Sequence, residues 1–212
     1  MKFSRIFLAL PLALLAAGCA SLEHSRDLAN PNVSGTTLAQ QVCSACHGVD
    51  GHAVSPNFPN LAAQQPVYFM AQLKEFRGHN RLDPAGFEYM WGISQHLTDD
   101  QIKGLAAYFS QQLPKPNLAG DAQSMAAGKQ IFEQGIAEKQ TIACMVCHGP
   151  KAQGRATFPR LANQHRDYLV KQLHVFQETE GRPGTPMKQI THFLTDPEMQ
   201  AVASYLQSMP VN

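Results

Sequence analysis

Apolar residues recur at helical spacing near the end of each half of this chain, and no alternating strand pattern of convincing length occurs. The apolar positions of these two stretches are Ile102, Leu105, Ala106 and Phe109, and Met199, Val202, Ala203 and Leu206. Each stretch follows a sequence that fits a capping box, Thr98 to Gln101 and Thr195 to Glu198. The sequence therefore predicts an all-α protein with a closing helix in each half.

Two more helices are expected in each half. A middle helix should begin near Pro66 in the first half and near Arg166 in the second. An opening helix should lead into a pair of cysteines in each half, with Thr37-Leu38-Ala39-Gln40 as its cap in the first. The closing helices should stop before Pro114 and Pro210, because a residue that precedes proline disfavours helical geometry.

The two halves are copies of one unit. Cys43-Ser44-Ala45-Cys46-His47-Gly48 recurs as Cys144-Met145-Val146-Cys147-His148-Gly149, and Phe58-Pro59-Asn60-Leu61-Ala62 recurs as Phe158-Pro159-Arg160-Leu161-Ala162. So many matches in the same order indicate two tandem domains. We expect a signal peptide over 1–18, a tether over 19–33, a first domain over 34–113, a linker over 114–124 and a second domain over 125–212.

The N-terminus has the pattern of a secretory signal peptide. Lys2 and Arg5 precede an apolar run over 6–17, which is too short to span a bilayer comfortably. The run ends in Leu15-Ala16-Ala17-Gly18-Cys19, which resembles the lipobox of bacterial lipoproteins. We therefore expect lipidation of Cys19 and a protein anchored on the periplasmic side of a bacterial membrane. Ordinary cleavage after Ala20 is the alternative, and it would discard Cys19.

Composition and charge narrow the classes of function. The net charge is +1, and removal of Lys2 and Arg5 with the leader leaves 15 basic against 16 acidic side chains, a charge of −1. A nucleic-acid binder is not expected, because phosphate recognition needs a clustered basic excess. Charged residues make up 16% of the chain, against about 25% in an average soluble domain. A large apolar cofactor that covers apolar surface would fit this low charge content.

The duplicated Cys-x-x-Cys-His motif predicts covalent attachment of two c-type haems. Cys43 and Cys46 would form thioethers to one haem and Cys144 and Cys147 to the other, and the following histidine would bind the iron. A zinc site would need a fourth ligand in each copy. A thioredoxin-like pair would need a strand-helix-strand context. Structural disulfides would leave the repeated histidine unexplained.

Each iron also needs a second axial ligand or an open face. Met90 and Met187 stand at matching repeat positions after His47 and His148, and thioether sulfur favours reduced iron. Four other histidines compete for this role, but none has a histidine at its repeat position: His79, His96, His174 and His192. Core packing is the expectation for Met70, Met125, Met199 and Met209.

From about Thr36 to Met209 the chain resembles the dihaem cytochrome c4 family of class I c-type cytochromes. The resemblance rests on Cys-x-x-Cys-His-Gly, Phe-Pro-x-Leu-Ala-x-Gln and Tyr-x-x-x-Gln-Leu-x-x-Phe, followed by an arginine, the methionine and the terminal helix. It implies that the Pro59 and Pro159 carbonyls accept the imidazole proton of the iron-binding histidines, and that Arg81 and Arg182 contact haem propionates. The alternative for Arg81 and Arg182 is an exposed side chain that forms a salt bridge. Ala63 and Asn163 depart from the family, which usually has glycine there.

The resemblance and the motifs together favour an electron carrier with no substrate turnover of its own. It would shuttle electrons between a quinol:cytochrome c oxidoreductase and a terminal oxidase or reductase. A dedicated electron-transfer subunit of a dehydrogenase, such as a sulfide-oxidising flavoprotein, is the alternative. A dihaem peroxidase is a weaker third idea, because it needs a vacant or displaceable iron ligand and both copies supply methionine.

Overall fold

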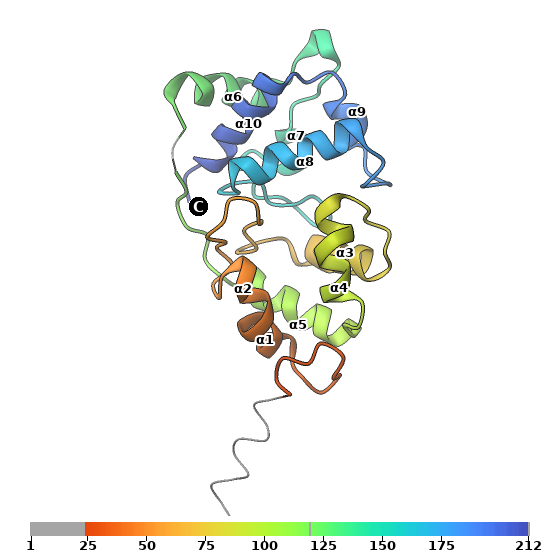
Figure 1. Ribbon diagram of the computed structural model, residues 1–212. Coiled ribbons are helices and arrows are strands. Elements are labelled where there is room, and N and C mark those ends of the chain that lie inside the picture. The colour runs from red at the N-terminus through yellow and green to blue at the C-terminus, as the bar shows by residue number, and fades with distance from the viewer. Residues whose placement is uncertain (1–23, 119, 212) are drawn as a thin grey trace, which may run out of the picture.

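The computed structural model describes residues 24–118 and 120–211, and these form two helical units that follow the two sequence copies. Figure 1 shows the first unit at the bottom, the second at the top and the linker running along one side. Apart from two isolated bridges, Ile136 to Thr141 and Arg155 to Phe158, the described residues contain no β-structure. The predicted all-α class is therefore confirmed. The leader and Cys19 lie outside the described residues.

The first unit begins with one continuous helical segment, made of α1 (Gly35–Leu38), a π-helical turn η1 (Ala39–Cys43) and α2 (Ser44–His47). The middle helix is α3 (Pro66–Arg77), as predicted. A second π-helical turn η2 (Gly86–Met90) continues into α4 (Trp91–Ser94), and α5 (Asp99–Ser110) closes the unit. The expected cap of the opening helix was wrong. Ser34 is the N-cap, and its hydroxyl accepts the Thr37 N–H, so the helix begins earlier than the Thr37-Leu38-Ala39-Gln40 pattern indicated.

The second unit repeats this order with one interruption. Its opening helix α6 (Ala122–Gln134) starts within the segment expected to be linker and is separated from α7 (Met145–His148) by the short 3₁₀ turn η3 (Ala137–Lys139). The middle helix α8 (Arg166–Glu178) and α9 (Met187–Thr191) follow. The helix α10 (Asp196–Gln207) closes the unit. The expectation that the opening helix runs directly into the cysteines is thus correct for the first copy and wrong for the second.

Each closing helix crosses the opening helix of its unit, α5 against α1 and α10 against α6. Both closing helices carry the predicted capping box, at Thr98 and Thr195. Glycine makes both crossings possible, because a Cβ on Gly35 would lie 2.6 Å from the Gln101 carbonyl oxygen and one on Gly128 would lie 2.1 Å from the Ala201 carbonyl oxygen. The closing and opening helices therefore touch through their backbones.

Replacing Gly128 by alanine should lower the free energy of unfolding by about 3 kcal/mol, at the upper end of what overpacking costs. The clash is with backbone, which cannot rotate away. Thermal unfolding of the protein checks this. Gly92→Ala is the matched control, because a Cβ there meets nothing within 4 Å and alanine favours a helix. Equal melting temperatures for the two variants would contradict the assigned crossing.

Each unit has its own hydrophobic core. In the first, helices α1, α3 and α5 contribute the largest buried side chains, among them Leu38, Phe69 and Phe109. In the second, α6, α8 and α10 do so, with Phe132 and Leu206 at its centre. The two cores do not merge, and polar groups outside them make hydrogen bonds between the units.

Two glutamines hold the units together in a reciprocal arrangement. The Gln64 amide accepts from Arg160 N–H at 2.7 Å and donates to the Arg160 carbonyl at 3.1 Å. The Gln164 amide does the same at the matching residue of the first unit, with Asn60 N–H at 2.7 Å and the Asn60 carbonyl at 3.0 Å. Equivalent residues thus exchange equivalent bonds, which gives the two units an approximate two-fold relation.

The residues that stand where the family usually has glycine adopt a glycine-like backbone. Ala63 has φ 54° and Asn163 has φ 62°, in the left-handed region. Their N–H groups donate to the carbonyls of Phe109 and Leu206, which ties each loop to the end of its closing helix. Asparagine tolerates this conformation well, whereas alanine costs about 1 kcal/mol there.

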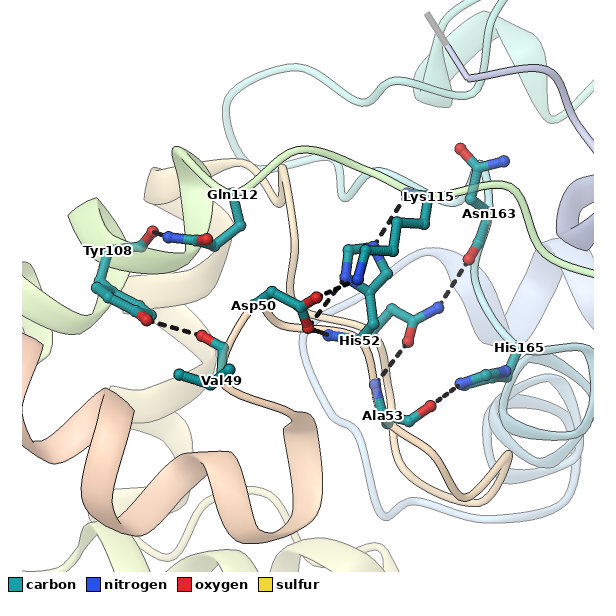
Figure 2. A network of polar contacts seen from close by, with 10 residues as sticks. Val49, Asp50, His52, Ala53, Tyr108, Gln112, Lys115, Asn163 and His165 are labelled. Atoms are coloured by element: carbon teal, nitrogen blue, oxygen red, sulfur yellow. Dashed lines mark hydrogen bonds and ion pairs between the residues drawn. The ribbon is translucent and has the colours of Figure 1, made fainter.

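The linker is fixed to the first unit beside this contact, as Figure 2 shows. Lys115 pairs with the Asp50 carboxylate through its ammonium group and donates its backbone N–H to His52 Nε2 at 3.0 Å. The hydrogen bond from Lys115 is the main reason that the pKa of Asp50 falls to about 2. Across the contact, His165 Nε2 donates to the Ala53 carbonyl at 2.8 Å. The start of the linker is therefore held on the first unit, next to a direct hydrogen bond between the two units.

The described part of the expected tether also lies against the first unit. Leu28 packs on the first core and Val33 is buried. The Gln101 amide of α5 donates to the carbonyls of Asn30 at 2.9 Å and Val33 at 3.0 Å. This segment is thus attached to the first unit before the opening helix begins.

Candidate functional site

The two Cys-x-x-Cys-His motifs occupy the same position in their units. The first cysteine of each motif is the N-cap of a short helical turn, α2 or α7, and the histidine is the last residue of that turn. Gly48 and Gly149 follow with φ 75° and φ 81°, which ends the turn at once. A Cβ at Gly48 would lie 2.3 Å from the His52 carbonyl oxygen, so no other residue fits there. The two cysteines and the histidine of each motif therefore lie within about one turn of backbone.

Each motif histidine is oriented by a proline carbonyl. His47 Nδ1 lies 2.9 Å from the Pro59 carbonyl oxygen, and His148 Nδ1 lies 3.0 Å from that of Pro159. Burial lowers the pKa of both imidazoles, and the hydrogen bonds to the carbonyls raise it in part. Because a carbonyl accepts, Nδ1 carries the proton of the neutral ring. Nε2 is then left with a lone pair for a metal, which is the arrangement expected of an iron-binding histidine.

The four motif cysteines are free thiols with no disulfide between them. Without an attached group, burial raises the pKa of the Cys43 and Cys144 thiols to about 11. Among the described residues no group of three or more His, Cys, Asp or Glu side chains converges to hold a metal ion. Each of the four cysteines is therefore available for one thioether bond.

Met90 and Met187 lie at equivalent places between the middle and closing helices. Both are half-buried. The carbonyl of Met90 accepts the Ser94 hydroxyl at 2.7 Å, and the carbonyl of Met187 accepts the Thr191 hydroxyl at 2.8 Å. The same bond at the same repeat position fixes each methionine backbone in the same way.

Three of the competing histidines make other contacts, and for His192 this is a ring contact with Phe193 at a centroid distance of 4.5 Å. The His79 ring stacks between Phe87 and Trp91, at centroid distances of 5.0 and 4.9 Å. His174 bridges Glu178 at 3.1 Å and Asp196 at 3.0 Å. His96 and His192 are exposed. Methionine remains the sixth-ligand candidate for which the two copies agree.

Arg81 and Arg182 meet at the contact between the units. The amide oxygen of Gln72 accepts from both, at 2.8 Å from Arg81 and 2.9 Å from Arg182. The amide oxygen of Gln172 also accepts from both, at 3.0 and 2.7 Å. Arg182 further donates to the Tyr68 hydroxyl at 3.2 Å. We call these five residues the arginine–glutamine cluster.

The two guanidinium groups of this cluster have fewer carboxylate partners than positive charges. Within the described residues Asp83 is the one carboxylate that pairs with either guanidinium, at 2.6 Å from Arg81. The buried Nε2 of Gln172 donates to nothing. A buried donor without an acceptor is costly, and a carboxylate is the group that two arginines and an amide would bind. The carboxylates of a haem would fit this requirement.

Sequence reasoning missed several members of the cluster. Gln72 and Gln172 were visible as a repeat match, and Tyr68 has its match in Tyr168. These residues follow the repeated Pro-x-Leu-Ala motif at the same distance in both copies. That repeated position was the signal in the sequence that could have indicated a role at the contact between the units. Asp83 has no counterpart in the second copy, so the repeat could not reveal it.

Two helical units, each with a Cys-x-x-Cys-His turn, a carbonyl-oriented histidine and an equivalent methionine, define the class of c-type cytochromes with two haems. Across the described residues, no helix has the length and apolar character needed to cross a membrane.

Comparisons with known proteins agree. The cytochrome c family model matches residues 33–112 and 125–210. The chain is 40% identical to cytochrome c-552 of Acidithiobacillus ferridurans over 212 residues, covering 99% of this chain and 90% of the relative. It is 34% identical to cytochrome c4 of Azotobacter vinelandii over 211 residues, covering 95% and 98%. A thiosulfate dehydrogenase electron acceptor of Stutzerimonas stutzeri is 32% identical over 182 residues, covering 82% of each chain.

Solved structures give the same result. Cytochrome c4 of Acidithiobacillus ferrooxidans superposes with a TM-score of 0.74 at 41% identity, covering 79% of this chain and 98% of the other. A thiosulfate dehydrogenase from Marichromatium purpuratum gives a TM-score of 0.70 at 30% identity, covering 89% of this chain and 40% of the other. The chain belongs to the cytochrome c family, and within it to the dihaem cytochrome c4 group. It carries two covalently bound haems and functions as an electron carrier.

Proposed function

We propose that the protein passes single electrons from a quinol-oxidising complex to a terminal oxidase or reductase on the periplasmic side of a bacterial membrane. The observation that carries this proposal is the arginine–glutamine cluster, since Gln72 and Gln172 each bind both arginines across the contact between the units. A rigid contact of this kind keeps two redox centres in one fixed relation. An electron received by one unit can then leave through the other.

Different residues would attach the haem, bind its iron and bind its propionates. A bound haem supplies a one-electron couple at its iron. The site residues under this proposal are Cys43, Cys46, Cys144 and Cys147 for attachment, His47, Met90, His148 and Met187 for the iron, and Arg81 and Arg182 for the propionates. The Pro59 and Pro159 carbonyls hold each imidazole in the tautomer that presents Nε2. With a histidine and a methionine bound to each iron, no position would be left open to a substrate.

The purified, reduced protein should react slowly with oxygen, peroxide, sulfide and thiosulfate offered one at a time, and should be reoxidised rapidly by membranes that contain a terminal oxidase. The reason is that the methionines close the irons to small molecules while the haem edge stays available to a protein partner. Stopped-flow absorbance measures both rates. Multiple turnovers with any one small molecule would contradict a pure carrier.

A second candidate is the electron-accepting subunit of a thiosulfate-oxidising enzyme. It is favoured by the relative named thiosulfate dehydrogenase electron acceptor and by the similarity to a thiosulfate dehydrogenase structure. Purification from native membranes distinguishes the two candidates. A dehydrogenase that remains bound through the purification, and that reduces this protein when thiosulfate is added, supports the subunit. Rapid exchange with a quinol-oxidising complex supports the carrier.

We also propose that Cys19 carries the lipid that holds the protein at the membrane, on the strength of the lipobox-like Leu15-Ala16-Ala17-Gly18-Cys19. Intact-mass analysis of the mature protein should give a chain that begins at Cys19 with diacylglycerol and an N-acyl chain. Two or three acyl chains anchor stably where one does not. Cys19→Ala should release the protein into the soluble fraction. A water-soluble mature chain that begins at Ser21 would refute lipidation.

A further inference from the structure

The two arginines at the contact between the units have unequal partners. Arg81 forms a two-pronged ion pair with Asp83, with Nε to Oδ1 at 2.6 Å and Nη2 to Oδ2 at 3.3 Å. Asp83 is 1% exposed and Arg81 is 6% exposed. Arg182 has neutral partners, Tyr68, Gln72 and Gln172. Among the described residues, a carboxylate therefore compensates the positive charge of the first arginine, and none compensates that of the second.

The position of Asp83 is tightly fixed by the second unit. The backbone N–H groups of Leu82 and Asp83 both donate to the Gly181 carbonyl, at 2.8 and 3.2 Å. A Cβ on Gly181 would come within 2.9 Å of the Asp83 nitrogen, so the two chains touch here. Asp83 thus lies at the contact between the units and is held there by backbone bonds from its own segment to Gly181.

The asymmetry is encoded in the length of one segment. Residues 82–89 separate Arg81 from Met90 in the first copy, whereas residues 183–186 separate Arg182 from Met187 in the second. The shorter segment, Pro183-Gly184-Thr185-Pro186, contains no acidic residue. The carboxylate is therefore a feature of the first copy alone, within an otherwise repeated site.

Charge near a haem sets its reduction potential. The oxidised centre carries one more positive charge than the reduced one, so a nearby carboxylate stabilises the oxidised form and lowers the potential. An uncompensated guanidinium has the opposite effect. Both effects are larger in a buried site than in water, because the effective dielectric constant is lower.

We propose that Asp83 is a positioning residue that holds the potential of the first haem below that of the second, by pairing with Arg81 and neutralising it. This inference rests on the proposed function in one respect, namely that Arg81 and Arg182 bind the propionates of their own haems. An electron that enters at the first unit is then driven toward the second.

The test is a spectroelectrochemical titration of the dihaem protein. Asp83→Asn keeps the shape of the side chain and removes its charge, so the lower potential should rise and the separation between the two should shrink. Asp83→Glu should restore the separation in part. Gln172→Glu places a carboxylate beside both Arg182 and Arg81. Because Arg81 is already paired with Asp83, the higher potential should fall more than the lower one, and the separation between them should shrink. The haem content and helicity of each variant are measured first.

Asp99→Asn is the matched control. Asp99 is an exposed carboxylate of the same unit that pairs with Lys74 and Arg77, and its loss should leave both potentials nearly unchanged. The Cys43→Ser, Cys46→Ser variant, which retains the second haem, gives the potential of that haem directly and assigns the two values.

The titration distinguishes a failure of the propionate role of the arginines from a failure of the role of Asp83. If Arg81→Gln and Arg182→Gln leave both potentials unchanged, the propionate role in the proposed function is wrong. If these two variants shift the potentials but Asp83→Asn changes the separation no more than Asp99→Asn does, the role of Asp83 is overturned. An increase in the separation with Asp83→Asn would also overturn it.

Discussion

The variant Cys43→Ser, Cys46→Ser should mature with one haem in place of two. Each haem depends on two thioether bonds from its own motif, and the thiols of the second unit lie on a separate helical turn, α7, that this change does not touch. Intact-mass analysis should show the loss of one haem mass. The pyridine haemochrome absorbance per mole of protein should fall by half.

The mirror variant, Cys144→Ser with Cys147→Ser, should give the same loss and leave the other haem. Ser44→Ala is the control, because Ser44 lies within the first motif and bonds to the Gln40 carbonyl without taking part in attachment. Acidified organic solvent should extract no haem from the native protein. Extraction of both haems would mean that neither is covalently attached.

Replacing Met187 by alanine should open the second iron to carbon monoxide and lower its potential. Thioether sulfur stabilises ferrous iron, so its loss favours the oxidised state, and the vacated position admits a diatomic ligand. The absorbance change on adding carbon monoxide to the reduced protein measures the first effect, and a redox titration measures the second. We expect one haem per chain to bind carbon monoxide in this variant and none in the native protein.

Met199→Ala is the control for a methionine of the same unit, because Met199 is 1% exposed and fills the core. It should lower the free energy of unfolding by about 2–5 kcal/mol without opening either iron. If Met187→Ala left the spectrum and the potential unchanged, another ligand would have to be sought, starting with His192 and His174.

The sequence predicted most of the helices because their signals are local. The capping boxes at Thr98 and Thr195 and the start of α3 at Pro66 each depend on residues within one turn. The start of the opening helix was missed because Ser34 and Thr37 both offer a capping hydroxyl, and the choice depends on packing of Gly35 against α5. The η3 insertion was missed because it has no counterpart in the first copy.

The candidate site was predictable where it repeats. The motif residues and the two methionines could be found by comparing the halves, and the resemblance to cytochrome c4 supplied the proline carbonyls. The reciprocal Gln64 and Gln164 bonds could not be predicted, because they depend on how one unit is placed against the other. The buried ion pair of Asp83 was not predicted for a different reason, because an aspartate in a loop is usually a solvated turn residue.

The segment attached to the first unit limits how far the protein could move from a membrane. With Leu28 and Val33 packed on that unit, only residues 20–23 separate Cys19 from the described chain, and the five steps along the chain from Cys19 to His24 reach at most about 18 Å however they are arranged. The chain enters at the end of the first unit that faces away from the second (Figure 1). A lipid on Cys19 would therefore keep the first unit close to the membrane surface. The first unit would meet membrane-embedded partners at high local concentration, and the second would lie on the side that faces away from the anchor.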